Sequence, residues 1–567
     1  MSSDDLKQKN FIQRLIGYSD NKKNFVRIFF CIIIFLTVAK IPSIFISDMQ
    51  PWDEGMYSTR VLAIHQFGDF FDQTEHSVQG LYSSSHPPLL VWLGYIFTLI
   101  FGNHVWVFKI IPFIFALLCI YLTIRIGEKL HSLSVGYFAA LMIAGNILFS
   151  VYAVRFQFDY PYLFFILWAV DVFLIFSESG NKINILYLGI IFGLCLMTKI
   201  LVGILIPGIF FITFFFIYKK IKVTFSDLIY ISLIGILIAL PWHIYMFAKY
   251  GKTFFDWFFS FHIFQRALFG VEQNTKNSGI LFHINFIVSI IPYSLLSFWA
   301  LLKYIFNFKK LSWNKIFLTV WFSLGLLIIT FFKTKLETYS LLIMPQAALM
   351  LGLYLKDIKM LSRKEKTLAL TLLLLNILWS LTYTSRDTLK LILLNRHNLI
   401  FILPASVLLI AIIVLIFYKF SDKLRPAVIY SASAILFFIG INIVHFLHVP
   451  YWADSYHLSE IKSEVIQSNV RNIIYVSSDY RANPQFTYYF SGLNLDWENK
   501  DFTYKQLDLK KDGIDKVRAE LDKLNPDDVN IIIEKDGINR TDYDSTYLFM
   551  PYKFKFIKKT SGYELYR

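Results

Sequence analysis

Long apolar runs separated by short polar stretches fill the chain up to residue 447. A run of about 20 apolar residues is long enough to cross the ~30 Å hydrocarbon core of a bilayer as a helix. The pattern therefore predicts a polytopic α-helical membrane protein with about 13 transmembrane helices. We expect these helices at residues 25–47, 105–126, 133–152, 160–176, 183–198, 200–218, 226–247, 283–304, 313–332, 338–355, 366–385, 398–418 and 426–447.

The apolar stretch 87–126 is long enough for two crossings, and the distribution of Lys and Arg decides between one and two. With a single crossing, the later basic clusters fall on the same side as the basic N-terminus, which the positive-inside rule places in the cytoplasm. We therefore predict a short or interfacial helix at 87–101 and a span at 105–126. The N-terminus is then inside, the C-terminus is outside, and long outer loops lie at 48–86 and 248–282.

The composition changes abruptly after residue 448, where the chain becomes polar. Residues 472–477 and 529–534 are short runs rich in β-branched residues, and 513–524 has apolar residues at helical spacing. This combination predicts a small α/β domain on the outer side of the membrane. The expected domains are a cytoplasmic segment at 1–24, a transmembrane domain at 25–447 and an outer α/β domain at 448–567.

Composition excludes several classes of function. The chain is 56% apolar and 17% charged, whereas soluble globular chains are about 45–50% apolar and about 25% charged. A soluble enzyme, a disordered chain and a nucleic-acid-binding domain are therefore poor interpretations. We attribute the net charge of +15 to basic cytoplasmic loops, and the three cysteines lie inside apolar runs and predict no disulfide framework.

Two acidic residues, Asp53 and Glu54, lie directly outside the first predicted span. Carboxylates near a membrane are costly unless they are solvated, paired or used, so they are candidates for a general base or a metal ligand. The alternative is an ordinary solvated pair of loop acids. His86 precedes Pro87 and Pro88, which can start a helix, and this histidine is either a structural hydrogen-bonding group or a ligand.

Basic residues at the predicted outer face run against the positive-inside rule. A bound anion, most naturally a phosphate or pyrophosphate, would account for them. The hydroxyl of Tyr339 could contact the same group, and His262 and Glu337 lie beside these basic positions as supporting residues. The outer basic residues are Arg155, Lys199, Arg266, Lys333 and Lys335.

Two of the outer basic residues also have a structural interpretation. Arg155 and Asp159 are four residues apart, so on a helix they would share a face and could form a salt bridge at a helix junction. The same pair could also support the active loop, and both interpretations can hold together. Lys199 could extend its ammonium to the interface from an apolar surrounding, or it could contact a phosphate.

The ordered motifs resemble one family, the polyprenyl-phosphate-dependent glycosyltransferases of the C-type membrane fold. Within it, the aminoarabinose transferases of lipid A and the bacterial protein-mannosyltransferase-like enzymes are most similar. The resemblance covers residues 25–350. The motifs that carry it are Asp53-Glu54, His86-Pro87-Pro88-Leu89, Arg155 with Asp159, Thr198-Lys199 with Pro207, Pro241-Trp242, His262 with Arg266, and Lys335-Leu336 with Tyr339 and Pro345.

The resemblance implies roles for individual residues. Asp53 matches the base that activates the acceptor, and Glu54 is its motif partner. Arg266 and Tyr339 match contacts to the donor phosphate, and Lys199 matches a lysine near it. The Arg155 and Asp159 positions match a pair near the catalytic pocket.

One motif departs from the family pattern. Aminoarabinose transferases typically carry Glu-Lys before Pro-Pro, and here Ser85 and His86 stand at those positions. This leaves open whether the site uses a divalent cation, for which Glu54 and His86 are the candidate ligands. His86 could instead donate to the donor phosphate when it is protonated.

The resemblance also implies a reaction and a place for it. A sugar would move from an undecaprenyl-phosphate donor to an envelope acceptor at the periplasmic face of the bacterial inner membrane. Lipid A or a similar glycolipid is the favoured acceptor, with a polysaccharide and a protein O-mannosyl acceptor as alternatives. A transporter of a lipid-linked precursor and a non-catalytic scaffold stay as rivals, although the sequence has no internal repeat and its unusual charges gather at one face.

Overall fold

The computed structural model describes residues 21–77, 80–199, 203–270, 279–357, 363–393, 426–448, 457–468, 470, 472–477, 484–490, 503–534, 554–560 and 562–567. The chain divides into two compact units. The first, here called the helical unit, comprises Met1–Ile41, Phe113–Ala153 and Phe158–His448. The second, here called the mixed unit, comprises Pro42–Pro112, Val154–Gln157 and Val449–Arg567.

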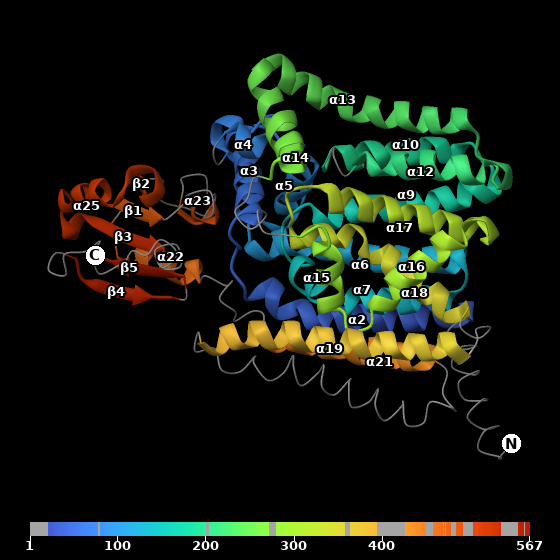
Figure 1. Cartoon of the computed structure of the whole chain (residues 1–567). Coiled ribbons are helices and arrows are strands. Elements are labelled where there is room, and N and C mark those ends of the chain that lie inside the picture. The colour runs from blue at the N-terminus through green and yellow to red at the C-terminus, as the bar shows by residue number, and fades with distance from the viewer. Residues whose placement is uncertain are drawn as a thin grey trace. The chain divides into compact units, whose positions relative to one another are not determined.

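Within the described residues, seven helices are long and apolar enough to cross a membrane, and Figure 1 shows the helices as a bundle of extended rods. The chain is therefore a multi-pass membrane protein, as predicted. The number of 13 spans stays a prediction, and the expected span at 398–418 lies outside the described residues. The seven long helices are α2 (Lys22–Phe45), α6 (Val105–Leu130), α9 (Asp159–Ser179), α13 (Phe225–Phe255), α17 (Trp313–Phe331), α19 (Arg363–Leu393) and α21 (Pro426–His448).

Two predicted spans are each broken into two helices. In 133–152, the side chain of Asn146 accepts a hydrogen bond from the Phe149 backbone N–H at 2.9 Å and starts a new helix there. In 283–304, Pro292 lacks the N–H that a continuous helix requires. The helices on either side of these breaks are α7 (Leu133–Ala144) and α8 (Ile147–Tyr152), and α15 (Phe282–Ile290) and α16 (Leu295–Phe306).

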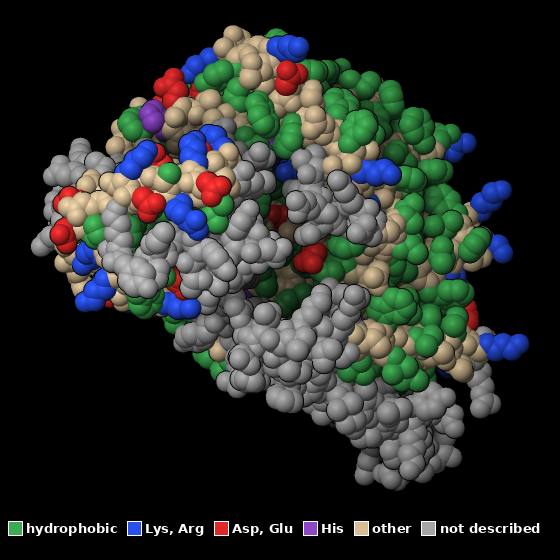
Figure 2. Space-filling model, turned by 60° about the vertical axis from the view of Figure 1, so that its left-hand side comes forward, with side chains coloured by type: hydrophobic (Ala, Val, Ile, Leu, Met, Phe, Trp, Pro, Cys, Tyr) green, Lys and Arg blue, Asp and Glu red, His purple; other side chains and the backbone are tan. Residues whose placement is uncertain are grey.

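The helical unit has an apolar exterior as well as an apolar interior. Leu36, Ile124 and Leu349 are fully buried. By contrast, Phe215 and Leu237 are 65% and 64% exposed, as expected for side chains that face lipid. Figure 2 shows hydrophobic side chains over much of the helices, with Lys and Arg projecting along one edge. The remaining elements of this unit are α10 (Ile183–Leu196), α12 (Leu205–Ile217), α18 (Met344–Asp357), and the 3-10 turns η2 (Tyr218–Lys220), η5 (Phe308–Lys310) and η6 (Glu337–Leu342).

The predicted outer loop 248–282 is largely helical. Helix α13 continues to Phe255 through a bend at Gly251, whose φ of 51° lies in the left-handed region that glycine adopts easily. A π-helix, η3 (Asp256–Gln265), follows directly, and then the short α14 (Arg266–Leu268). These residues form helices because the segment is rich in Phe and has no proline to stop the helix, and their place on the outer side of the membrane stays a prediction.

The predicted outer loop 48–86 also folds into helices, all in the mixed unit. As predicted, the stretch 87–126 separates into two helices, because Gly102 ends the first one with a φ of 81°. The second is α6. The other elements are α3 (Asp53–Phe67), the 3-10 turn η1 (Thr74–His76), α4 (Leu81–Ser84) and α5 (Leu89–Phe101).

The C-terminal part of the mixed unit contains a five-stranded sheet of order β2-β1-β3-β5-β4. Strand β1 is parallel to β2 and β3, whereas β5 is antiparallel to β3 and β4. Buried Ile474, Ile531 and Ile533 form its core with Val517 of α25. The predicted small α/β fold is confirmed, while its boundaries stay a prediction. The elements are α22 (Leu458–Gln467), β1 (Asn472–Ser477), α23 (Gln485–Phe490), β2 (Thr503–Asp508), α24 (Leu509–Asp512), α25 (Ile514–Asp522), η10 (Pro526–Asp528), β3 (Val529–Glu534), β4 (Phe556–Lys559) and β5 (Tyr563–Tyr566).

Candidate active site

The residues that the sequence predicts for the site fall into two groups, one in each unit. Each group is described within its own unit. The mixed unit carries Asp53, Glu54, His86 and Arg155, and the helical unit carries Asp159, Lys199, His262, Arg266, Lys333, Lys335, Glu337 and Tyr339.

The two adjacent acids open helix α3. Trp52, directly before them, has φ 62° and ψ −122°, a region that costs energy for any residue other than glycine. Helix α3 then begins at Asp53, and carboxylates are favoured in a first helical turn because backbone N–H groups point toward them. The Asp53 side chain is partly exposed and that of Glu54 is buried, so the two acids occupy different environments.

Glu54 is a fully engaged carboxylate. One oxygen, Oε2, accepts a hydrogen bond from the Gln50 backbone N–H at 2.5 Å, and Oε1 accepts one from the Phe156 N–H at 2.9 Å. The ammonium of Lys109, on α6, lies 3.4 Å from Oε2, and both side chains are 1% exposed. A buried charge is tolerated only when it is paired and hydrogen-bonded, and Glu54 meets this condition through Gln50, Lys109 and Phe156. These partners come from three segments of the mixed unit, which Glu54 therefore joins.

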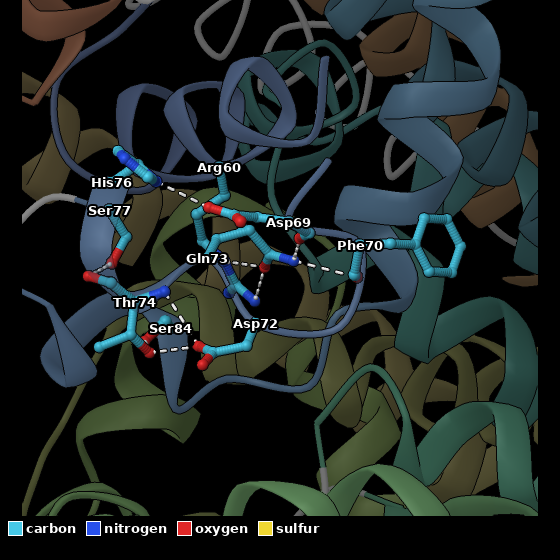
Figure 3. A network of polar contacts seen from close by, with 9 residues as sticks. All are labelled: Arg60, Asp69, Phe70, Asp72, Gln73, Thr74, His76, Ser77 and Ser84. Atoms are coloured by element: carbon cyan, nitrogen blue, oxygen red, sulfur yellow. Dashed lines mark hydrogen bonds and ion pairs between the residues drawn. The ribbon is translucent and has the colours of Figure 1, made fainter. Parts of the chain in front are cut away.

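A buried arginine holds the loop that carries His86, and Figure 3 shows its contact with Gln73 of that loop. Arg60 of α3 donates to the Gln73 side-chain oxygen from Nε at 3.1 Å and from Nη2 at 2.9 Å. It also donates to the carbonyls of Ser83 at 3.0 Å and His86 at 3.1 Å. Burial lowers the pKa of Arg60 to about 10, so it is charged at neutral pH and fixes the His86 backbone against α3.

The same loop is stiffened by further polar contacts, which Figure 3 shows together. The Asp69 carboxylate lies 2.7 Å from His76 Nδ1. Asp72 accepts from the Thr74 backbone N–H at 3.0 Å, and the hydroxyls of Thr74 and Ser84 are 2.7 Å apart. These contacts connect the described residues 69–76 of the loop with Ser84, two positions before His86.

The His86 ring lies edge-on to the ring of Tyr57, with 6.2 Å between their centroids, and is partly exposed. The open question of a divalent cation concerns this ring and Glu54. Both Glu54 oxygens already accept hydrogen bonds. Across the described ranges, no three His, Cys, Asp or Glu side chains gather as a set of metal ligands. The arrangement therefore does not fit a cation held through Glu54.

In the helical unit, Lys199 lies among three aromatic rings. Its Nζ is 4.2 Å from the ring centroid of Phe158, 5.5 Å from that of Tyr339 and 5.9 Å from that of Tyr162. Ring faces attract cations at such distances. Asp159 lies within electrostatic reach of Lys199 and accepts a hydrogen bond from the Tyr162 hydroxyl at 2.9 Å. The structure thus brings together three predicted residues, Lys199, Tyr339 and Asp159.

The predicted helical spacing of Arg155 and Asp159 is wrong. Helix α9 begins at Asp159, and Arg155 lies in the bend before it, so the two side chains do not share a helix face. Pro161 is tolerated in a first helical turn but not further inside, which agrees with this start. Within the mixed unit, the bend is also held by Glu54, which accepts a hydrogen bond from the Phe156 N–H.

Arg266 and Lys333 come from segments that pair through their backbones. The Lys333 N–H donates to the Ala267 carbonyl at 2.9 Å, and the Thr334 N–H donates to the Arg266 carbonyl at 3.0 Å. Arg266 directly follows the π-helix η3, which contains the half-buried His262. Irregular π segments occur frequently at functional sites, and here one delivers Arg266 beside Lys333.

The lysines near Arg266 differ in what they contact. The buried Lys335 ammonium donates to the carbonyl of Ile329 at 2.8 Å and to that of Thr330, which lie in the last turn of α17. The last carbonyls of a helix lack N–H partners within the helix, so a cation at the end of α17 can donate hydrogen bonds to them. Burial, and then the charge of Lys333, lower the pKa of Lys335. Lys333 and Glu337 are exposed.

Sequence reasoning missed several residues that build these groups. Lys109 was a lone charge inside an apolar run, which was a usable signal for a buried partner. Arg60 was a lone basic residue in an outer loop and gave a weaker signal. His283 gave none, although its Nδ1 lies 2.9 Å from the Ser340 hydroxyl and its ring lies 6.3 Å from that of Tyr339.

Comparison with known proteins agrees with this architecture. Residues 85–245 match the family described as dolichyl-phosphate-mannose-protein mannosyltransferase. The crystal structure of ArnT from Cupriavidus metallidurans bound to undecaprenyl phosphate matches with a TM-score of 0.68 and 13% identity, over 96% of this chain and 98% of that chain. The apo structure of the same protein matches with a TM-score of 0.67 and 12% identity, over the same shares. None of the curated proteins matches by sequence. The predicted C-type membrane fold is confirmed.

Proposed function

Because the chain has the fold of ArnT and a segment that matches the protein mannosyltransferase family, we propose that it is a multi-pass glycosyltransferase, and we propose a substrate pair for it. It moves a sugar from undecaprenyl phosphate to an envelope acceptor, at the periplasmic face of the bacterial inner membrane. The observation that carries this proposal is the cluster of Lys199, Tyr339 and Asp159 in the helical unit. The ArnT structure with undecaprenyl phosphate bound supports the choice of donor.

Cationic and hydroxyl groups of the helical unit bind the donor phosphate in this proposal. Arg266 can contact two phosphate oxygens at once, and Lys199 and Tyr339 supply an ammonium and a hydroxyl beside each other. Exposed Lys333 adds a further donor, and Lys335 adds positive charge from the end of α17. The partly exposed His86 is a further candidate donor, carried by the mixed unit. As the phosphate leaves, these groups stabilise the negative charge that develops on it.

Asp53 acts as the general base on the acceptor. It accepts the proton of the acceptor hydroxyl or acceptor phosphate while that acceptor oxygen forms a bond to the sugar's anomeric carbon, and the bond from this carbon to the oxygen of the donor phosphate breaks. The transfer inverts the configuration because attack and departure occur on opposite faces. Glu54 is already paired with Lys109, so it holds the first turn of α3 in place. Arg155 in the mixed unit and Asp159, His262 and Glu337 in the helical unit have supporting roles in this proposal.

The favoured acceptor is lipid A or a similar glycolipid, because the fold match to ArnT extends over nearly the whole chain. A protein O-mannosyl acceptor is the second candidate, and the family match over residues 85–245 is the observation that favours it. A single experiment separates these two acceptors.

Mass spectrometry of lipid A and of envelope glycoproteins tests the proposal. The cells compared carry the native chain, Asp53→Asn, Lys199→Met or no chain, with Lys523→Met, which removes an exposed lysine of the C-terminal fold, as the matched control. We expect a sugar increment on lipid A with the native chain and the control, and none in the other three. Loss of a protein glycan instead selects the second candidate. Unchanged lipid A and glycoproteins refute the transferase and reopen transport of a lipid-linked precursor.

A further inference from the structure

Helix α23, in the C-terminal fold, packs directly against the start of α3. A Cβ added at Gly55 would lie 2.2 Å from the backbone nitrogen of Gln485 and 2.7 Å from the carbonyl carbon of Pro484. Real Cβ atoms essentially never come that close to backbone atoms, so glycine is required at this position. The residue after Glu54 is thus in backbone-to-backbone contact with a segment more than 400 positions later in the sequence.

Two more contacts hold the residues just before the acids. The Tyr489 hydroxyl of α23 accepts a hydrogen bond from the Met49 backbone N–H at 3.2 Å. The Ser459 backbone N–H, in the first turn of α22, donates to the Asp48 carboxylate at 3.0 Å. The C-terminal fold therefore contacts the chain on both sides of Asp53, through hydrogen bonds at 48–49 and through close packing at Gly55.

Helix α23 is itself fixed, both to the sheet and to α6. The Gln485 amide donates to the Tyr563 hydroxyl of β5 at 2.9 Å, and the ring of Phe486 stacks on Tyr475 of β1 at 3.7 Å. In the other direction, the Tyr488 hydroxyl donates to Asn103 at 3.2 Å, and its ring lies edge-on to Phe108 at 5.7 Å. Phe108 is adjacent to Lys109, the partner of Glu54.

From these contacts we propose that α23 is a positioning element for Asp53, so that the C-terminal α/β fold takes part in the transfer step. This inference rests on the proposed function. The left-handed φ of Trp52 persists only if the residues around it are held on both sides, and α23 and α22 provide that hold. Asp53 lies between the fixed points with a partly exposed side chain. The fold thereby sets the direction of the carboxylate and leaves donor binding to the helical unit.

Two substitutions in the full-length chain test this inference. Gly55→Ala forces α3 away from α23, and Tyr489→Phe removes one hydrogen-bond acceptor with little change of shape. We expect faster amide hydrogen exchange in the peptide that covers 48–56 for both variants. We also expect kcat for sugar release from the undecaprenyl-phosphate donor to fall about 100-fold for Gly55→Ala and about 10-fold for Tyr489→Phe, because a displaced catalytic group costs rate. The Kd for undecaprenyl phosphate should stay within about two-fold.

Matched controls make the same chemical changes elsewhere. Gly208→Ala adds a Cβ to a helix where the nearest atom is 3.8 Å away, and Tyr566→Phe removes a hydroxyl that donates to Glu564 within β5. Both should leave exchange at 48–56 and kcat unchanged.

The inference is overturned if exchange at 48–56 does not change, or if kcat and the affinity for undecaprenyl phosphate fall together, as a general loss of folding would cause. If the wild-type chain transfers no sugar, the proposed function is refuted. If amide exchange at 48–56 is nevertheless faster in both variants, the result still supports the contact of α23 with the Asp53 turn.

Discussion

The acidic and the cationic groups of the candidate site are built by different means. Glu54 is held atom by atom, with two backbone N–H groups and the Lys109 ammonium on its oxygens. Lys199 lies among ring faces, which attract an ammonium through its charge and not through individual N–H groups. A group that must keep its neighbours in place is locked by directional bonds. Lys199, which we propose as a phosphate contact, has contacts that tolerate a change in the direction of its ammonium.

The largest expected effect separates Asp53 from Glu54. Asp53→Asn removes the base but keeps the shape and the first-turn position, so we expect kcat to fall by about 10²–10⁴-fold with an unchanged melting temperature. Sugar transfer from the undecaprenyl-phosphate donor and thermal unfolding in detergent measure the two quantities. Near-native kcat in Asp53→Asn would remove this residue from the role of base.

The next effect concerns the buried pair. Glu54→Gln or Lys109→Met leaves one buried charge without its partner, which should cost about 3–5 kcal/mol of the free energy of unfolding. The double variant should recover part of that loss. Unfolding in denaturing detergent measures all three. Lys505→Met, which breaks the more exposed pair with Glu520 at 2.6 Å, is the control and should cost no more than about 1 kcal/mol. Equal losses in the buried and exposed pairs would contradict the assignment.

A smaller effect is expected for the rings around Lys199. Phe158→Leu removes the nearest ring face while keeping an apolar side chain, so the ammonium is less well placed for a phosphate. We expect the Kd for undecaprenyl phosphate to rise by about 2–30-fold, from a cation–π contribution of about 0.5–2 kcal/mol. Phe115→Leu, in a different aromatic cluster of α6, should leave the Kd unchanged. Equal Kd values for the two variants would show that the rings are packing alone.

The smallest effect distinguishes Lys335 from Lys333. Lys335→Met removes the cation at the end of α17, which should destabilise the chain by about 0.3–1 kcal/mol, with little change in the Kd for undecaprenyl phosphate. Lys333→Met should show the reverse, because its side chain is exposed. Thermal unfolding and a binding titration on both variants measure this. A larger rise in Kd for Lys335→Met would place its ammonium on the donor instead.

Local patterns in the sequence predicted much of the fold. The turn at Gly102-Asn103-His104 separated α5 from α6, and the β-rich runs and the helical spacing located β1, β3 and α25. The single crossing that the basic clusters predict at 87–126 stays a prediction. The breaks at Asn146 and Pro292 were missed because apolar length outweighs a single cap or proline in a hydropathy pattern. Arg155 was placed on the helix of Asp159 because spacing alone does not show where a helix begins.

The candidate site was less accessible to sequence reasoning. The pair Asp53-Glu54 stood out, but the partner of Glu54 is 55 positions away in the sequence and reaches it only through the tertiary fold. The contact of Gly55 with Gln485 is more distant still. Neither contact leaves a local pattern in the sequence. The first depends on a lone charge in an apolar helix, and the second depends on backbone groups.

The contact between Gly55 and Gln485 also imposes an order on the making of the protein. Ribosomes add about 5–20 residues per second, so α23 emerges tens of seconds after α3 has been made. During that interval the turn that carries Asp53 lacks its contact with α23. A nascent or prematurely terminated chain without α23 therefore leaves the Asp53 turn without this contact, and under the proposed function we expect no sugar transfer before α23 has been translated.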